Sequence, residues 1–259
     1  VQAAQILVAE SLAVGDAAAP VLDEHIRAAD QFAQRLDALG LLQVERHAEL
    51  LRPAPDDRIL DAGSGTANVT AVLAVPGARV TGIDFCEPAL ERCRRKVPTA
   101  EFLVADLTRT LPFGDATFDK AACSLVLHYL TPERQRFALT ELRRVLRPDG
   151  ALAISVFAKG FNTWRVYGET LRARRETDGV VGTAVAGARY LVNTARIFYY
   201  VWRIKRAEKS GDYRFATAED LRDMLSGAGF RVVSVEPTMA GQCWTALARK
   251  PGAAADGGQ

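Results

Sequence analysis

The spacing of hydrophobic residues changes once along the chain, near residue 53. Residues 1–52 have apolar side chains about one helical turn apart and no alternating run of the kind that forms a strand. Gly40 falls between two such helical runs and predicts a break between two helices. The turn-rich stretch 52–57 (Arg-Pro-Ala-Pro-Asp-Asp) then ends this part. We therefore expect a helical N-terminal cap over residues 1–52.

From residue 58 onward, short apolar runs alternate with amphipathic ones. The pattern predicts strands over 58–61, 79–84, 101–105, 118–123 and 151–157, and helices over 68–73, 87–97 and 132–146. Such alternation implies right-handed crossovers and a parallel, doubly wound α/β sheet of the Rossmann-like kind. Residues 231–236 and 242–249 predict an antiparallel hairpin at the sheet edge. We expect a core over 53–157, its completion over 213–250, and a disordered tail over 251–259.

The first predicted strand runs into a glycine-rich turn at Gly63, Ser64 and Gly65. Glycine adopts backbone conformations that other residues avoid and lets a ligand approach the main chain. The helix that follows points free N–H groups at that ligand. A plain turn is the alternative, because turns use glycine routinely. The motif predicts a nucleotide-type cofactor.

Two positions near this turn favour S-adenosylmethionine (SAM) over a dinucleotide. The dinucleotide fingerprint has a third glycine where this chain has Asn68. The carboxylate of Asp61, two residues before Gly63, would repel a pyrophosphate but attract the ammonium and sulfonium groups of SAM. A helix or turn cap is the alternative role for Asp61.

Polar residues also follow the later strands, whose carboxyl ends form the ligand crevice of such a sheet. Asp84 lies 19 residues after Gly65, where a carboxylate can accept both ribose hydroxyls; the alternative is an N-cap for the next helix. Asp106 can receive the exocyclic amine of adenine, with Leu107 stacking nearby, or it is simply a turn carboxylate. Ser124 would lie along the methionine end of the cofactor.

Taken in order, these motifs resemble those of class I SAM-dependent methyltransferases that act on quinones, sterols and small metabolites. The motifs are Leu60-Asp-Ala-Gly-Ser-Gly-Thr66, Val80-Thr-Gly-Ile-Asp84, Val104-Ala-Asp-Leu107, Leu125-Val-Leu-His-Tyr129 and Glu141-Leu-Arg-Arg-Val-Leu-Arg-Pro-Asp-Gly150. The resemblance implies a seven-stranded sheet, SAM as cofactor and S-adenosylhomocysteine (SAH) as product. It places SAM across Asp61, Gly63, Gly65, Asp84, Phe85, Asp106, Leu107 and Ser124. Ser64 and Ala67 depart slightly from the family, which often has cysteine and glycine there.

The composition narrows the class of protein. The net charge is +2, from 33 basic and 31 acidic residues, and so it does not indicate binding to nucleic acid or to a membrane surface. The four cysteines have no C-x-x-C spacing and no neighbouring histidine cluster, so the sequence supports no metal site and no disulfide framework. Without a secretion signal or an apolar run of spanning length, we expect a cytoplasmic protein.

Residues 158–212 lie outside the resemblance, and we interpret them as a helical lid over the acceptor pocket. They hold 11 basic and 5 acidic residues and 8 of the 20 aromatic residues. An oligomer or packing surface is the alternative. Within the lid, Arg196, Tyr200 and Arg203 recur at helical spacing, which predicts contact with an anionic end of a hydrophobic acceptor. A solvated stripe, or a helix that binds a membrane surface or partner, would have the same spacing.

His128 is our candidate for the base that takes a proton from the acceptor, with Tyr129 as second choice. His128 follows the fourth strand, beside the expected methyl donor, and the alternative is a packing residue. His25 and His47 are interpreted as surface or satisfied core residues. The sequence thus predicts methyl transfer to an oxygen or carbon of a small molecule. An NAD(P)-dependent oxidoreductase and a SAM-binding protein without methyl transfer are the rival hypotheses.

Overall fold

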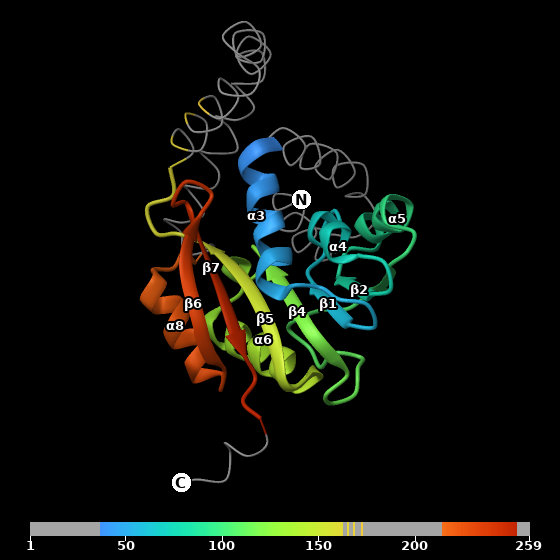
Figure 1. Cartoon of the computed structure of the whole chain (residues 1–259). Coiled ribbons are helices and arrows are strands. Elements are labelled where there is room, and N and C mark those ends of the chain that lie inside the picture. The colour runs from blue at the N-terminus through green and yellow to red at the C-terminus, as the bar shows by residue number, and fades with distance from the viewer. Residues whose placement is uncertain (1–36, 163–164, 166–167, 169–171, 173–213, 253–259) are drawn as a thin grey trace, which may run out of the picture.

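The computed structural model describes residues 37–162, 165, 168, 172 and 214–252, and these residues form a seven-stranded sheet flanked by helices (Figure 1). The strands are β1 (Arg58–Ala62), β2 (Arg79–Asp84), β3 (Glu101–Val104), β4 (Phe118–Ser124), β5 (Leu146–Phe157), β6 (Arg231–Thr238) and β7 (Cys243–Arg249). Their order is β3-β2-β1-β4-β5-β7-β6. Strands β1 to β5 are parallel, and β7 is antiparallel to both β5 and β6. The predicted doubly wound sheet with a C-terminal hairpin is confirmed.

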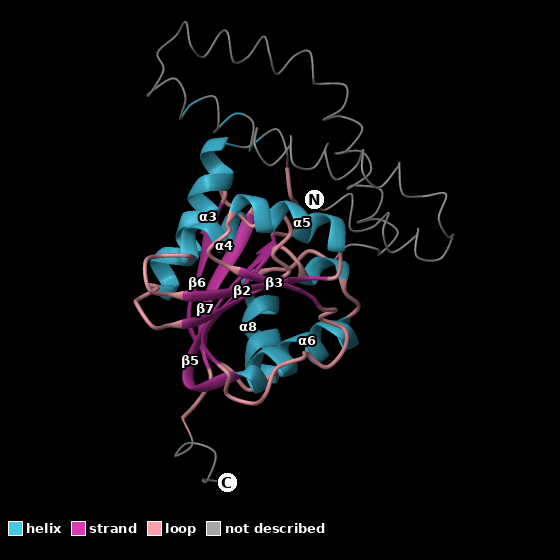
Figure 2. Ribbon diagram, turned by 90° about the vertical axis from the view of Figure 1, so that its right-hand side faces the viewer, coloured by secondary structure: helices cyan, strands magenta, loops and turns pink. Residues whose placement is uncertain are grey.

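Helices cover both faces of the sheet (Figure 2). One face carries α3 (Asp37–Leu51), α4 (Asn68–Leu73) and α5 (Glu87–Lys96); the other carries α6 (Pro132–Val145) and α8 (Ala218–Gly227), and a short 3-10 turn, η2 (Leu127–Tyr129), follows β4. The larger apolar core lies between the sheet and α6 and α8, and a second core lies under α3 and α4. Because helices cover both faces of the sheet, a ligand site is expected at the ends of the strands.

The ends of the helices follow local chemistry. At the start of α8, the amide of Asp220 donates to the hydroxyl of Thr217 at 3.1 Å, and the amide of Thr217 donates to the carboxylate of Asp220 at 2.7 Å. This reciprocal pair is a capping box, which satisfies two amides that a helix leaves without partners. Helix α6 begins with Pro132, which suits the first helical position because no amide is needed there.

Three sequence-based expectations about element boundaries are wrong. Gly40 does not separate two helices, because α3 continues through it from Asp37; a glycine inside a helix costs only about 1 kcal/mol. Strand β5 begins at Leu146 rather than at residue 151, because Leu146 pairs with Phe118 ahead of an irregularity in the register. Pro237 lies within β6 rather than in the turn, and β6 tolerates it as the last strand of the sheet.

The strand order reverses between β1 and β4, which are neighbours in the sheet although β2 and β3 separate them in the chain. In open α/β sheets, the crevice at the carboxyl ends of the strands beside such a reversal binds ligands. The carboxyl ends of β1 and β4 are Ala62 and Ser124. The fold therefore directs attention to the loops that leave these two strands.

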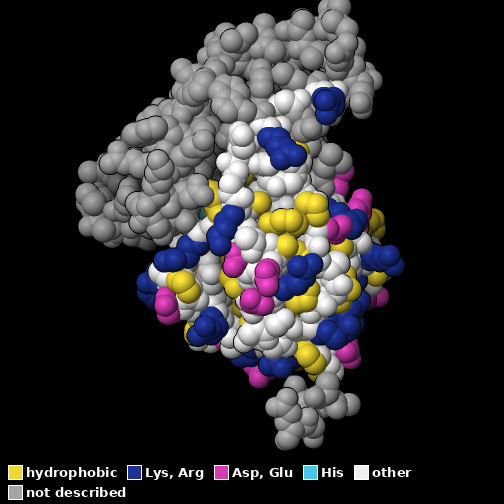
Figure 3. Space-filling view, turned by 90° about the vertical axis from the view of Figure 1, so that its left-hand side faces the viewer, with side chains coloured by type: hydrophobic (Ala, Val, Ile, Leu, Met, Phe, Trp, Pro, Cys, Tyr) yellow, Lys and Arg dark blue, Asp and Glu magenta, His cyan; other side chains and the backbone are white. Residues whose placement is uncertain are grey.

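The face of the molecule over α8 and β6 mixes charges of both signs (Figure 3). Arg222, Asp223 and Arg231 are exposed in these elements. In the part of this face that the structure describes, basic and acidic side chains are interspersed, so no continuous basic patch forms there. Among the described helices, none has the length and apolar character needed to cross a membrane.

Candidate active site

The turn after β1 has a backbone that requires glycine. Gly63 has a φ of 79° and Gly65 a φ of 52°. A Cβ atom on Gly63 would lie 2.4 Å from Cγ2 of Val126, a residue of the loop after β4. The amides of Gly63 and Ser64 each donate to the carbonyl of Ile83 at 2.8 Å, which fixes the turn to the end of β2. The glycines thus bring three strand ends into one rigid group.

Helix α5 supports the same turn from outside. The thiol of Cys93 donates to the carbonyl of Gly65, with 3.1 Å between the sulfur and oxygen atoms. The ammonium group of Lys96 donates to the carbonyl of Thr66 at 2.9 Å. Ala67, at the N-cap of α4, has a left-handed φ of 55°, which costs about 1 kcal/mol in a residue other than glycine. The departure from the family at this position is a small local strain, and the turn keeps its shape.

Asp84 ends β2 and is buried beside the glycine turn. Its Oδ2 accepts a hydrogen bond from the amide of Gly65, and its Oδ1 accepts one from the amide of Cys86, each at 3.0 Å. Cys86 rather than Asp84 is the N-cap of α5. These two contacts orient the carboxylate of Asp84 toward the glycine turn.

Asp61 lies in β1 with 1% of its surface exposed. Its Oδ2 accepts a hydrogen bond of 2.6 Å from the hydroxyl of Thr70, in the first turn of α4. This contact supports the helix-cap alternative, and a contact with the cofactor stays a prediction. Burial raises the pKa of Asp61 to about 6, the Thr70 hydroxyl opposes the rise, and the charge of Asp84 adds to it. An ammonium or sulfonium group nearby would stabilise its charged form.

The loop after β3 carries the predicted adenine contacts. Oδ1 of Asp106 accepts a hydrogen bond from the amide of Thr108 at 2.8 Å, so the turn role proposed for this carboxylate is present. The side chain of Asp106 is 43% exposed and can still contact a ligand. Leu107 is buried in the main core, and Phe85, which follows β2, is half-buried. The structure places Phe85 and Asp106 on adjacent strand ends, as the sequence predicts.

Ser124 ends β4 beside the glycine turn. The next residue, Leu125, has a left-handed φ of 54°, and its amide donates to the carbonyl of Ser155 in β5 at 2.9 Å. Ser124 is half-buried and is the register partner of Ser155. The predicted cofactor residues therefore follow one line across the strand ends, from β3 through β2 and β1 to β4.

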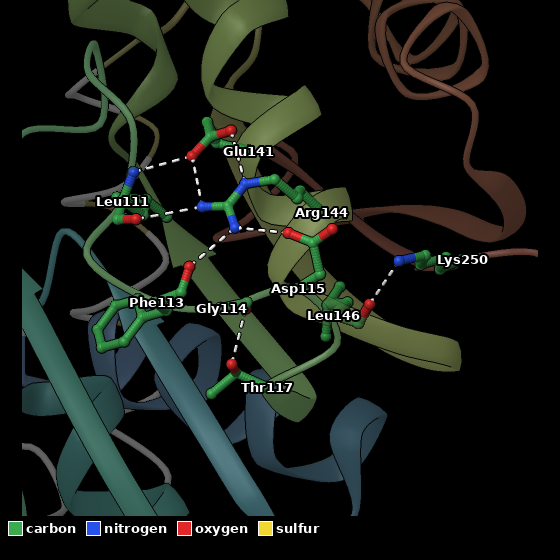
Figure 4. Close-up of polar contacts among 9 residues, drawn as sticks. All are labelled: Leu111, Phe113, Gly114, Asp115, Thr117, Glu141, Arg144, Leu146 and Lys250. Atoms are coloured by element: carbon green, nitrogen blue, oxygen red, sulfur yellow. Dashed lines mark hydrogen bonds and ion pairs between the residues drawn. The ribbon is translucent and has the colours of Figure 1, made fainter.

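An ionic clamp holds the segment between β3 and β4 against α6 (Figure 4). Arg144 donates to both carboxylate oxygens of Glu141, to a carboxylate oxygen of Asp115, and to the carbonyls of Leu111 and Phe113, at 2.8 to 3.1 Å. Glu141 in turn accepts a hydrogen bond from the amide of Leu111 at 2.8 Å. The bond from Arg144 lowers the pKa of Glu141. The clamp fixes the chain that leads away from Asp106.

His128 is buried in η2, with 2% of its surface exposed. Its ring lies 3.9 Å from that of Tyr129, 4.8 Å from that of Phe157 and 6.4 Å from that of Phe215, measured between centroids. Burial lowers the pKa of His128 to about 3, so the imidazole is neutral near pH 7 and a weak base. This surrounding supports the packing alternative; the catalytic role of His128 and Tyr129 stays a prediction.

Sequence reasoning missed two features beyond β4. Phe157, Phe161 and Phe215 form an aromatic cluster with centroids 5.0 to 6.3 Å apart, and the signal for it is the aromatic residue that ends β5. His47, for which the sequence left a surface and a core position open, is fully buried, and its Nε2 lies 3.1 Å from Oγ of Ser155. Oγ of Ser155 also lies 2.9 Å from the hydroxyl of Thr245, which extends the polar chain into β7. No local pattern pairs these distant residues.

The predicted acceptor residues Arg196, Tyr200 and Arg203 lie outside the described residues, as does most of the predicted lid. Where the chain enters and leaves residues 158–212, Ala158 and Ala216 form an isolated parallel bridge. The first residue of the predicted lid and the described chain that follows the lid therefore lie beside the aromatic cluster. Within the described ranges, no group of three or more His, Cys, Asp or Glu side chains could hold a metal ion.

Residues 60–154 match a family model described as a methyltransferase domain, and this match spans the glycine turn, Asp84, Asp106 and Ser124. Over this segment the chain is similar to methyltransferase domains, which supports the predicted class I SAM-dependent methyltransferase superfamily. This match is consistent with strand-end carboxylates beside a glycine turn that lacks the third glycine of dinucleotide sites. It supports the SAM hypothesis over the oxidoreductase hypothesis.

Curated relatives cover part of the chain. An uncharacterized methyltransferase of Synechocystis is 36% identical over 124 residues, which is 46% of this chain and 58% of that protein. The demethylmenaquinone methyltransferase of Beutenbergia cavernae is 34% identical over 137 residues, 50% of this chain and 56% of that protein. The chain thus spans little more than half the length of these relatives.

Solved structures share the fold over more of the chain. A TehB-like SAM-dependent methyltransferase from Corynebacterium glutamicum has a TM-score of 0.58 at 16% identity, and the match covers 88% of this chain and 99% of that one. The cyclase SpnF has a TM-score of 0.56 at 18% identity, with 82% and 81% covered. The same fold therefore occurs in a methyltransferase and in a cyclase, so the activity has to be argued from the site.

Proposed function

We propose that this chain transfers a methyl group from SAM to an oxygen or carbon nucleophile of a small, hydrophobic molecule. The observation that carries the proposal is the line of carboxylates across the strand ends, Asp106, Asp84 and Asp61, which meets the glycine turn of a methyltransferase domain. The line suits a ligand with hydroxyls in the middle and positive charge at one end. SAM has this distribution.

The residues that are present fit SAM. A Cβ at Gly63 would lie 2.4 Å from Cγ2 of Val126, so only glycine lets the loop after β4 pack directly against the turn that would hold SAM. Asp84 is already held by two amides in the orientation in which it can accept ribose hydroxyls. The raised pKa of Asp61 indicates a carboxylate that a nearby cation would stabilise. A dinucleotide would instead bring its pyrophosphate toward these carboxylates.

SAM would supply a methyl group bound to a positively charged sulfur, and the sulfur would depart as part of neutral SAH when a nucleophile attacks the methyl carbon in line. The protein would contribute by holding the cofactor and the acceptor in position. Asp84 and Asp106 orient the adenosine end, and Ser124 lies where the amino-acid end is expected. The glycine turn and the clamp on Leu111 keep these groups fixed. We expect most of the rate to come from holding the two reactants at attack distance, because effective molarities for well-oriented groups reach about 10⁵ M or more.

The acceptor side is apolar and aromatic. Phe157 and Phe215 are buried beside η2, and Tyr129 and Phe161 pack against them. An aromatic surface next to the methyl position suits a flat or isoprenoid acceptor, and quinone-type acceptors fall in this class, as the name of the Beutenbergia relative suggests. An anionic end on the acceptor, held by Arg196, Tyr200 and Arg203, is the finer part of the proposal.

Methyl-labelled SAM and a panel of acceptors test the proposed activity. The panel contains a reduced naphthoquinone, a prenyl diphosphate, an aromatic carboxylate and a malonyl thioester, and label that moves to an extractable product identifies the acceptor class. We expect transfer to a hydrophobic member and formation of SAH. If SAM binds in calorimetry but no member accepts label, the rival hypothesis of a SAM-binding protein without methyl transfer gains support. If SAM does not bind, both hypotheses fail.

A further inference from the structure

Gln43 of α3 has a buried amide group that lacks an acceptor. The residue is 3% exposed, and its Nε2 finds no hydrogen-bond partner in the part of the chain that the structure describes. Gln135, a second buried glutamine, shows the usual situation, because its Nε2 donates to the carbonyl of Leu127 at 2.8 Å. A buried donor without an acceptor lowers stability, so its presence in a folded protein calls for a functional reason.

The position of Gln43 along α3 places it level with the carboxyl edge of the sheet. Leu51, at the end of α3, belongs to the apolar cluster that holds the first half of β5. Four residues before Leu51, about one helical turn, His47 contacts Ser155 near the end of β5. Gln43 lies one further turn along, about 6 Å away, which is the length of about two strand residues. Because β5 ends two residues after Ser155, Gln43 stands at the strand ends.

Gln43 is also on the same face of the sheet as the predicted cofactor contact of β4. Ser155 points toward α3, since its hydroxyl meets His47. Ser124 is the register partner of Ser155, and partners in a parallel sheet point to the same face. The adenosine contacts lie at β2 and β3, so a ligand that extends along the strand ends brings its other end to β4. That end of SAM carries an α-carboxylate.

We infer that the carboxamide of Gln43 donates a hydrogen bond to the carboxylate of the amino-acid end of SAM, an inference that rests on the proposed function. Nε2 is a donor, and a carboxylate oxygen is the strongest acceptor that the cofactor offers. Gln43 is thus a cofactor-binding residue contributed by the N-terminal helix, outside the glycine turn and the strand ends.

Helix α3 is held firmly enough to present this donor. Nδ1 of His47 lies 2.9 Å from the carbonyl of Gln43 itself, and Nε2 of the same ring lies 3.1 Å from Ser155. Arg46 donates from Nε and Nη2 to the carboxylate of Glu236 in β6, at 2.7 to 3.0 Å. The backbone of α3 at Gln43 is therefore held in place before a ligand binds, which reduces the entropy lost on binding.

The test compares two ligands in calorimetric titrations of the wild-type chain and the variant Gln43→Leu. SAH has the amino-acid end, and 5′-methylthioadenosine has the same nucleoside without it. We expect Gln43→Leu to weaken SAH binding by about tenfold or more, the usual effect of losing a hydrogen bond to a charged group, and to leave 5′-methylthioadenosine binding within about twofold of wild type. The ratio of the two affinities carries the inference.

Thermal unfolding of the ligand-free proteins separates binding from folding. Gln43→Leu removes a donor that has no acceptor, so its unfolding temperature should equal or exceed that of the wild type. The control variant Gln135→Leu should unfold at a lower temperature, because the carbonyl of Leu127 loses its donor. The inference is overturned if SAH affinity is unchanged in Gln43→Leu, or if both ligands weaken equally. Failure of the wild type to bind SAH would overturn the proposed function as well.

Discussion

The two halves of the sheet are held together in different ways. In the donor half, made of β3, β2 and β1, the site depends on short-range bonds such as those from the amides of Cys86 and Gly65 to Asp84, over 2 and 19 residues of sequence. In the acceptor half, made of β4, β5, β7 and β6, three polar contacts connect residues that are 90 to 190 positions apart: His47 with Ser155, Ser155 with Thr245, and Arg46 with Glu236. This half also contains the aromatic cluster around Phe157 and Phe215.

This difference separates two tasks. In the proposed function, the donor half would hold one cofactor in one orientation, and backbone amides, glycines and carboxylates close to one another in the chain are sufficient for that task. The acceptor half would present an apolar surface, to which η2, β5 and Phe215 contribute aromatic side chains. The donor half can therefore be recognised from motifs in the sequence. The acceptor surface depends on contacts between residues that are far apart in the sequence and meet only in the folded chain.

The largest effect should follow from removing the ionic clamp between α6 and the segment that joins β3 of the donor half to β4. Arg144→Ala leaves the carboxylate of Glu141 buried without the guanidinium that neutralises it, and it frees the carbonyls of Leu111 and Phe113. We expect the unfolding free energy to fall by about 3 kcal/mol in urea titrations. Arg143→Ala, the control, removes a bond to the carbonyl of Gly229 at the surface and should cost about 0.5 kcal/mol. Equal losses in the two variants would contradict the clamp.

A second change tests the donor half through its ligand. Asp84→Ala should weaken SAM binding by about 1.5 to 3 kcal/mol in calorimetry, because hydrogen bonds to a charged group are lost. Asp223→Ala, which removes an exposed carboxylate on α8, is the matched control and should leave SAM affinity unchanged. An affinity within threefold of wild type for Asp84→Ala would show that the ribose assignment is wrong.

The third prediction concerns the pH dependence of the donor half. The pKa of Asp61 is about 6 in the folded protein and near its usual 3.8 in the unfolded chain, so the folded protein binds the proton more tightly. Proton binding to Asp61 therefore increases the unfolding free energy. This increase is fully present below about pH 4 and is lost as the pH rises through 6. Asp61→Asn cannot ionise. Its unfolding free energy relative to wild type should therefore increase by about 2 kcal/mol between pH 4 and pH 8. A difference that stays constant with pH would mean that Asp61 is not desolvated.

The smallest expected effect concerns the protonation of His128 in the acceptor half. Nuclear magnetic resonance of the ring nitrogens should show His128 neutral from pH 8 down to about pH 4, since burial lowers its pKa to about 3. His47, also buried, has its pKa lowered to about 4 and serves as an internal comparison. A pKa of His128 near 6.5 would favour the role of general base, and a loss of turnover by about 10² or more in His128→Ala would support it.

The sequence allowed much of the donor half to be predicted. Helix α4 has the predicted bounds, and Asp84 and Asp106 lie at the predicted strand ends, because short-range patterns determine each of them. The sequence offered a helix or turn cap as the alternative role of Asp61, but it did not identify Thr70 as the partner. The unmatched donor of Gln43 could not be predicted, since it depends on how α3 packs against β5. Burial changes the chemistry of His128, and burial is a property of the folded chain.

A crystal structure of the chain with SAH would show whether one cofactor extends across the strand ends from β3 to β4. We expect adenine beside Asp106 and Leu107, the ribose hydroxyls on Asp84, and the amino-acid end between Ser124 and Gln43. SAH bound with its ribose away from Asp84, or its carboxylate far from both Ser124 and Gln43, would contradict this placement.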